Sequence, residues 1–116
     1  MCGIIAYSGY ENAGNIIIKG LEALEYRGYD SAGMTVFTEN KTVTIKTNGR
    51  VFQLKHKADN IKENTFCGIG HTRWATHGKP TLDNAHPHSS EHFTLVHNGI
   101  IENEEELRNK YLRNLS

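Results

Sequence analysis

Residues 1–10 read MCGIIAYSGY, and this stretch has two interpretations. The apolar run over residues 2–8, followed by Gly9, predicts a buried β-strand. Cysteine is small and often buried, so Cys2 can simply be a core residue of that strand. If Met1 is removed, however, Cys2 carries both a thiol and a free α-amine, a group whose pKa of about 8 leaves it partly unprotonated at neutral pH. Cys2 then supplies both nucleophile and base for acyl transfer.

Helical periodicity follows this first strand. Apolar residues recur every three or four positions over residues 12–25, which predicts a helix with one apolar face. The same spacing over residues 51–61 predicts a second helix. We expect both helices to cover the same core.

The remaining chain alternates between strand and loop patterns. Two β-branched runs, residues 34–38 and 42–47, are joined by a short link, which predicts an antiparallel hairpin. Further strands are expected over residues 66–76 and 93–99, with loops over residues 25–33 and 77–88. A last helix is expected over residues 100–115, with Asn103 as its cap and Glu106 three residues on. Strands, hairpins and helices in this order indicate a layered α+β fold.

Composition limits the class of protein. A length of 116 residues suits one hydrophobic core, and 13 basic residues balance 13 acidic ones, so no charged surface for nucleic acid or anionic lipid is expected. No apolar run is long enough for a membrane helix. Two cysteines are too few for a disulfide framework, which favours reduced thiols and a cytoplasmic location. Cys67 is expected to pack in a central strand and to be inert.

Four other residues could serve acyl transfer, and each has a simpler interpretation. The Asn98 side-chain amide and the Gly99 backbone N–H could stabilise an oxyanion, although Asn-Gly is also the commonest two-residue hairpin turn. Arg73 could hold a carboxylate with two parallel hydrogen bonds, or be an ordinary surface residue. Trp74 could close over a ligand at a loop mouth, or belong to the core.

Seven histidines exceed what packing requires. A metal site is one interpretation, because His86, His88 and His92 lie close together in the sequence and His71, His77 and His97 could complete a shell. None of the pairs follows the HExxH or CxxC pattern, and no Asp or Glu lies at ligand spacing within residues 84–90. We therefore expect no metal and no cofactor.

Five motifs carry a resemblance: MCGI, LEYRGYDSAG, GHTRWATHG, NAHPH and HNGIIEN, in this order. They are similar to those of the glutaminase domain of the glutamine:fructose-6-phosphate aminotransferases, which are N-terminal-nucleophile amidotransferases. The resemblance implies a four-layer αββα sandwich, with residues 1–116 as the amino-terminal part of a type 2 amidotransferase domain. The rest of that domain and the sugar isomerase domains would be absent.

The resemblance also implies roles for particular residues. Cys2 would be the nucleophile that hydrolyses L-glutamine, with Asn98 and Gly99 as the oxyanion hole. Residues 73–81 resemble the loop that closes over glutamine, and His86 would line the pocket in which glutamine binds. In that loop, the glutamine carboxylate would be bound by Arg73, Thr76 and His77, and Trp74 would stand at the entrance of the ammonia passage.

The same resemblance implies what residues 1–116 lack. The acidic residue that binds the glutamine α-amine is expected downstream of Ser116, and the domains that bind fructose 6-phosphate and form most contacts of a homo-oligomer would lie there too. The alternative is therefore a catalytically incomplete piece with a binding, regulatory or structural role, and a retained Met1 would favour it because the amine would be blocked.

Overall fold

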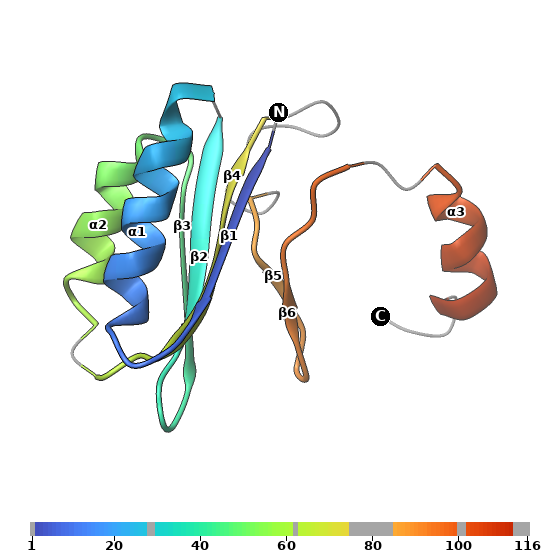
Figure 1. Cartoon of the computed structure of the whole chain (residues 1–116). Helices are drawn as coiled ribbons and strands as arrows, with labels where there is room; N and C mark the ends of the chain where they lie inside the picture. The colour runs from blue at the N-terminus through green and yellow to red at the C-terminus, as the bar shows by residue number, and fades with distance from the viewer. Residues whose placement is uncertain (1, 28–29, 62, 75–84, 100–101, 113–116) are drawn as a thin grey trace.

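The fold is built around a four-stranded antiparallel sheet (Figure 1), seen in a computed structural model that describes residues 2–27, 30–61, 63–74, 85–99 and 102–112. Its order is β1-β4-β2-β3, so β4 pairs with β1 on one side and with β2 on the other. The strands are β1 (Gly3–Ser8), β2 (Ser31–Phe37), β3 (Thr42–Thr47) and β4 (Cys67–Arg73).

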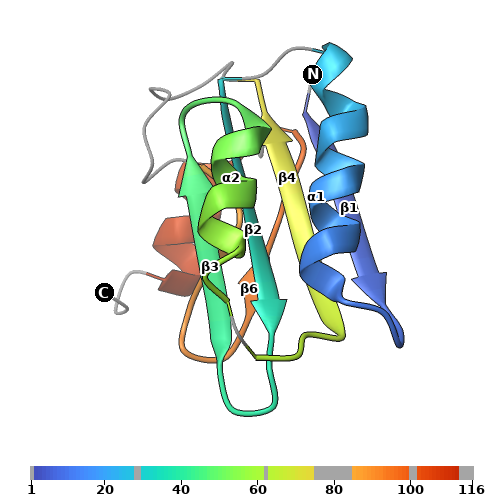
Figure 2. The same cartoon turned by 90° about the vertical axis from the view of Figure 1, so that its left-hand side faces the viewer.

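Two helices cover one face of this sheet. α1 (Ala13–Leu24) lies over β1 and β4, and α2 (Val51–Ala58) lies over β2 and β3 (Figure 2). α1 begins at Asn12, whose Oδ1 accepts a hydrogen bond from the Asn15 N–H at 2.9 Å, and its apolar face buries Ile17 and Leu21. Glycines on β4 let the helix approach closely, because a Cβ at Gly70 would lie 2.6 Å from Ile17 Cγ2.

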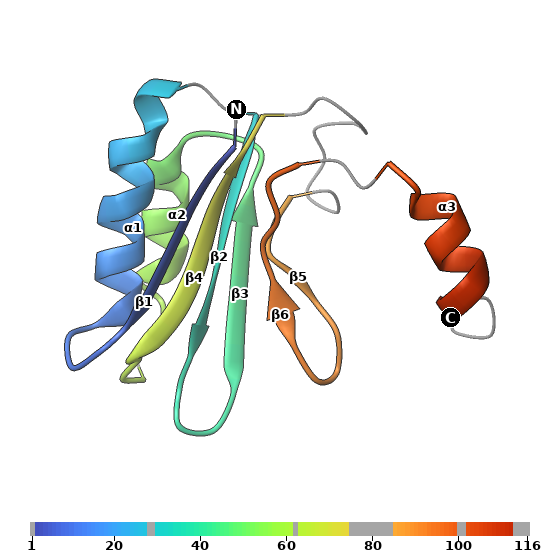
Figure 3. The ribbon, with the colours of Figure 1, turned by 45° about the vertical axis from the view of Figure 1, so that its right-hand side comes forward.

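A short hairpin forms a second layer on the opposite face of the sheet (Figure 3). It consists of β5 (His88–Ser89) and β6 (Thr94–Leu95). Just before it, the carbonyl of His86 lies directly over Gly33 of β2, in space that a side chain at Gly33 would occupy. The two layers therefore meet through main-chain atoms at this point.

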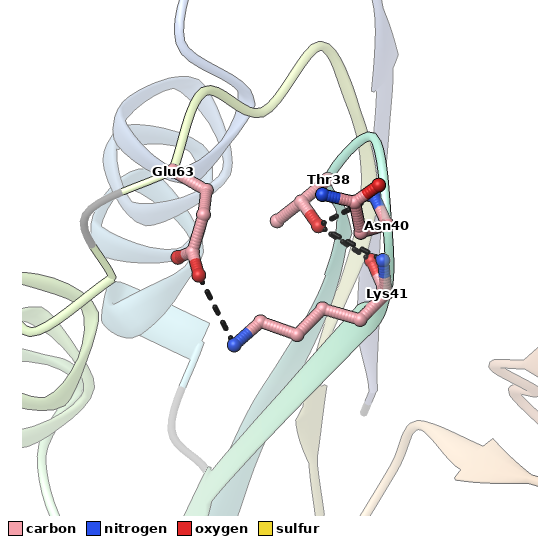
Figure 4. A network of polar contacts seen from close by, with 4 residues as sticks. All are labelled: Thr38, Asn40, Lys41 and Glu63. Atoms are coloured by element: carbon pink, nitrogen blue, oxygen red, sulfur yellow. Dashed lines mark hydrogen bonds and ion pairs between the residues drawn. The ribbon is translucent and has the colours of Figure 1, made fainter.

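The tip of the β2–β3 hairpin is held by polar contacts (Figure 4). Thr38 Oγ1 accepts hydrogen bonds from the N–H groups of Asn40 and Lys41, at 3.3 and 3.0 Å. Lys41 Nζ also pairs with Glu63 at 3.1 Å, which links the hairpin to the segment before β4. Both side chains of this pair are largely exposed, so the pair contributes little to stability.

The predicted α+β class is confirmed. Helices, main sheet, small second sheet and α3 (Glu104–Leu107) follow one another in space (Figure 1), which is the layer order of an αββα sandwich. The first strand, the two helices on the sheet and the 42–47 strand agree with the sequence patterns. The second helix is shorter than expected: α2 ends at Ala58, and the Ile61 N–H donates to the Ala58 carbonyl at 2.9 Å. No helix within the described ranges is long and apolar enough to cross a membrane.

Three local predictions are wrong. β2 begins at Ser31, inside the expected loop over residues 25–33, because Ser31, Ala32 and Gly33 pair with β4. The expected strand over residues 93–99 is reduced to Thr94–Leu95. Asn103 makes no side-chain cap, and the last helix changes after α3 into a π-helical turn, Arg108–Leu112. Most of the expected loop over residues 77–88 lies outside the described residues.

Replacing Gly33 by alanine tests the contact between the layers. The added Cβ would overlap the His86 carbonyl, a backbone group that cannot rotate away, so we expect a loss of about 1–3 kcal/mol in the free energy of unfolding. Urea unfolding of this chain, followed by fluorescence of its one tryptophan, measures the loss. Gly49→Ala is the control, because its Cβ would meet only the end of the flexible Gln53 side chain. Equal stability of the two variants would contradict the close approach.

Candidate active site

The β1–β4 pairing places Cys2 beside Trp74. Gly3 pairs with Thr72, so the residue that precedes β1 meets the residues that end β4. The Trp74 N–H donates to Cys2 Sγ at 3.5 Å, and the thiol in turn lies 3.9 Å from the Trp74 carbonyl oxygen. Cys2 is half-buried and Trp74 is 50% exposed, so the thiol lies at the rim of the sheet and is not a core residue.

Asn98 reaches the same place from the second layer. Its Nδ2 donates to the carbonyl oxygen of Cys2 at 3.3 Å, across 96 positions of sequence. Gly99, next to it, has φ of +141°, a value that residues with side chains rarely adopt. The hairpin-turn interpretation is wrong, because that turn needs positive φ at both residues and among the described residues only a glycine, Gly99, has one.

Arg73 is a buried residue at the end of β4. Arg73 is only 9% exposed, and its backbone carbonyl accepts a hydrogen bond from the Asp30 N–H at 2.7 Å. The surface-residue interpretation of Arg73 is therefore wrong. A guanidinium is suited to bind a carboxylate with two parallel hydrogen bonds. Thr76 and His77, the other residues expected to bind a carboxylate, lie outside the described residues.

Histidines gather between β4 and the second layer. The ring of His71, 0% exposed, stacks on that of His86 with centroids 4.1 Å apart and planes at 21°, and His88 lies 4.4 Å from His86. His71 Nε2 donates to the His97 carbonyl at 2.8 Å, while the His97 N–H donates to His86 Nδ1 at 3.2 Å. His92 stands apart, exposed in the β5–β6 turn.

Burial controls the charge of these histidines. Desolvation lowers the pKa of His86 to about 3, with further lowering by His71, His88, Arg73 and His97. Burial also lowers the pKa of His71 and of His88, the latter helped by Lys46 and Arg73. The rings are therefore neutral at neutral pH. In the described part of the chain, no three His, Cys, Asp or Glu side chains are arranged to hold a metal ion.

Sequence reasoning did not assign His71 or His97 to the acyl-transfer site. A signal was available for His71: residues alternate between the two faces of a strand, so His71 shares a face with Arg73, while Gly68 and Gly70 face α1. His97 contributes only backbone bonds, which no residue pattern reveals.

Comparison with known proteins gives consistent results, although no family model matches the chain. The chain is 55% identical over its whole length to a glutamine–fructose-6-phosphate aminotransferase (isomerizing) of Staphylococcus epidermidis, and 54% identical to the one of Staphylococcus aureus. It spans about a fifth of the length of these curated relatives.

Solved structures resemble the fold. One, described as the allosteric regulatory enzyme of purine biosynthesis, matches with a TM-score of 0.81 and 26% sequence identity. Another, glutamine phosphoribosylpyrophosphate amidotransferase from B. subtilis, matches with a TM-score of 0.79 and 25% sequence identity. Each match covers 100% of this chain and 26% of the solved chain. The fold is thus that of the N-terminal-nucleophile amidotransferases.

The low pKa of His86 predicts a pH-dependent stability. The unfolded chain binds a proton at His86 below a pKa of 6.5, whereas the folded chain does so only at about 3. The contribution of neutral His86 to the free energy of unfolding is therefore fully present above the unfolded-state pKa of 6.5, and it is lost as the pH falls toward the folded-state pKa of about 3. We expect the urea midpoint to fall between about pH 7 and about pH 5, and to fall less in His86→Asn. The control is His92→Asn, whose side chain is exposed and whose urea midpoint should fall as much as that of the wild type. A fall reduced as much in His92→Asn as in His86→Asn would contradict the assignment to His86.

Proposed function

Because the chain belongs to the glutamine–fructose-6-phosphate aminotransferase family, we propose that it forms the amino-terminal part of a domain that hydrolyses glutamine and releases ammonia. The relatives that it matches are about five times longer, so the proposal concerns a complete protein of which these residues are one part. Fructose 6-phosphate would receive the ammonia in domains outside the 116 residues. Homo-oligomeric assembly and a cytoplasmic location are part of the same proposal.

One observation carries the proposal: a cysteine, a tryptophan and an asparagine, far apart in the sequence, meet at one point. Trp74 N lies 3.5 Å from Cys2 Sγ, and Asn98 Nδ2 lies 3.3 Å from Cys2 O. A plain structural role for Cys2 would not require an exposed tryptophan and a side-chain amide around it. A thiol nucleophile with a neighbouring oxyanion donor does require such surroundings.

In the proposed reaction the Cys2 thiol loses its proton to its own α-amine, once Met1 has been removed. The sulfur attacks the side-chain carbonyl carbon of glutamine, and the resulting oxyanion is stabilised by the Asn98 amide and the Gly99 N–H. The C–N bond then breaks, the protonated amine returns its proton to the leaving nitrogen, and ammonia departs. Water hydrolyses the remaining thioester to glutamate. Asn98 Nδ2 must exchange the Cys2 carbonyl for the oxyanion in this sequence.

Glutamine is held by residues at the end of β4. The buried guanidinium of Arg73 would bind the α-carboxylate, with Thr76 and His77 proposed as further contacts on the basis of the resemblance alone. Trp74, half-exposed, would stand at the entrance of the ammonia passage, and His86 would line the pocket from the second layer. No metal or cofactor has a role in this scheme.

The two cysteines provide the primary test of function. In the complete protein, Cys2→Ala should abolish glutamine hydrolysis, whereas Cys67→Ala should leave it largely intact, because Cys67 lies at the opposite end of β4. Ammonia release measures both, and the intact mass shows whether Met1 has been removed. Hydrolysis that persists in Cys2→Ala, or in a protein that retains Met1, would show that Cys2 is not the nucleophile and would leave these residues with a binding or structural role.

Asn98 tests the oxyanion assignment. In the complete protein, Asn98→Asp puts a carboxylate where negative charge develops, and loss of one such donor typically lowers kcat by about 100- to 1,000-fold. The melting temperature should stay within a few degrees, because Asp has the same shape. Asn40→Asp, the same change in the distant β2–β3 turn, is the control. Near-normal kcat in folded Asn98→Asp would refute the assignment.

A further inference from the structure

We propose that His71 and His86 are positioning residues for the oxyanion donors: together they hold the peptide groups of His97, the residue directly before Asn98 and Gly99. Neither ring needs to touch the reacting atoms for this role. The inference rests on the proposed function, since it assigns these histidines to the same site.

The two histidines bind both backbone groups of one residue. His71 Nε2 donates to the His97 carbonyl at 2.8 Å, and His86 Nδ1 accepts from the His97 N–H at 3.2 Å. His97 lies beyond the two-residue ladder of β6, which ends at Leu95, so strand pairing does not fix it. The histidines therefore replace the missing ladder in holding this part of the main chain.

The two rings are themselves held by the main sheet. His71 lies in β4, opposite Ile4 of β1 and Gly33 of β2. His86 stacks on the His71 ring at 4.1 Å, and its own carbonyl rests over Gly33. A displacement of either ring would thus have to move the interior strand of the sheet or open the contact between layers. Strand β4, which positions Cys2, therefore also positions His97 through these two rings.

Only one pair of protonation states satisfies both hydrogen bonds with neutral rings. Nδ1 of His86 must lack a proton to accept from His97, and Nε2 of His71 must carry one to donate. The second nitrogen of His71, Nδ1, is buried and has no hydrogen-bond partner among the described residues, which fits a neutral ring with its single proton on Nε2. Arg73 and His88 disfavour an added positive charge on either ring, whereas the hydrogen bond to the His97 carbonyl favours it on His71 but does not outweigh the burial of that ring.

The consequence reaches Cys2 through one residue. Asn98 follows His97 directly, and its Nδ2 already lies 3.3 Å from the Cys2 carbonyl. A shift of about 1 Å in catalytic geometry can cost about 100-fold in rate. Releasing the His97 peptide should therefore lower kcat much more than it changes KM, because the donors matter most when the oxyanion forms.

Two pairs of variants in the complete protein test the proposal. Gln places an amide N–H near the position of His Nε2, so His71→Gln keeps the donor that His71→Leu removes. Asn places a carbonyl oxygen near the position of His Nδ1, so His86→Asn keeps the acceptor that His86→Leu removes. We expect each Leu variant to lose about 10- to 100-fold in kcat for glutamine hydrolysis, with KM within about threefold, and the polar variants to recover most of it.

Alkylation of Cys2 by iodoacetamide separates positioning from general damage. This reaction uses the thiol but forms no oxyanion, so its rate should be unchanged in all four variants. His92→Leu, exposed in the β5–β6 turn, should leave both measurements unchanged. If His71→Leu does not fold, the His86 pair decides the question, because His86 is only partly buried.

The outcomes distinguish this proposal from the one it rests on. Wild-type kcat in a folded Leu variant, equal losses in matched Leu and polar variants, or a parallel loss of alkylation would overturn the positioning role while leaving Cys2-dependent hydrolysis standing. Hydrolysis by the wild-type protein that does not depend on Cys2 would overturn the proposed function itself, and the positioning role with it.

Discussion

The backbone pairing between β1 and β4 is the interaction on which the site depends. Gly3 opposite Thr72 places the thiol of Cys2 against the main chain of Trp74, although 72 residues separate them. All six residues of β1, an edge strand, pair with the interior strand β4, so this placement does not depend on any one side chain. The nucleophile that we propose is thus held by the sheet itself.

β4 serves two different purposes on its two faces. Toward the helices it presents Gly68 and Gly70, which let Ile17 of α1 pack against the strand. Toward the second layer it presents His71 and Arg73, both buried and both polar. The seven residues of β4 can serve both purposes because alternate side chains of a strand point to opposite faces of the sheet.

The sequence predicted the elements with clear periodicity and failed where tertiary contacts decide. The helix that became α1 and the β2–β3 hairpin follow from local patterns. The strand expected over residues 93–99 was too long, because the backbone of His97 bonds to histidine side chains and not to a neighbouring strand. Residue type and resemblance led us to propose roles for Cys2, Asn98 and Arg73, whereas the sequence suggested His71 only as a metal ligand. The role that we propose for His71 depends on its hydrogen bond to the His97 carbonyl, which the sequence does not reveal.

The contact between Gly33 and the His86 carbonyl has a consequence for how such a site can diverge. Where two layers touch through main-chain atoms, no substitution can reshape the surface between them without separating the layers. The distance between β2 and the second layer at this point is therefore set by main-chain atoms and not by a side chain. A lineage that enlarged residue 33 would have to move the second layer away from β2, and would carry His86 away from the ring of His71 with it.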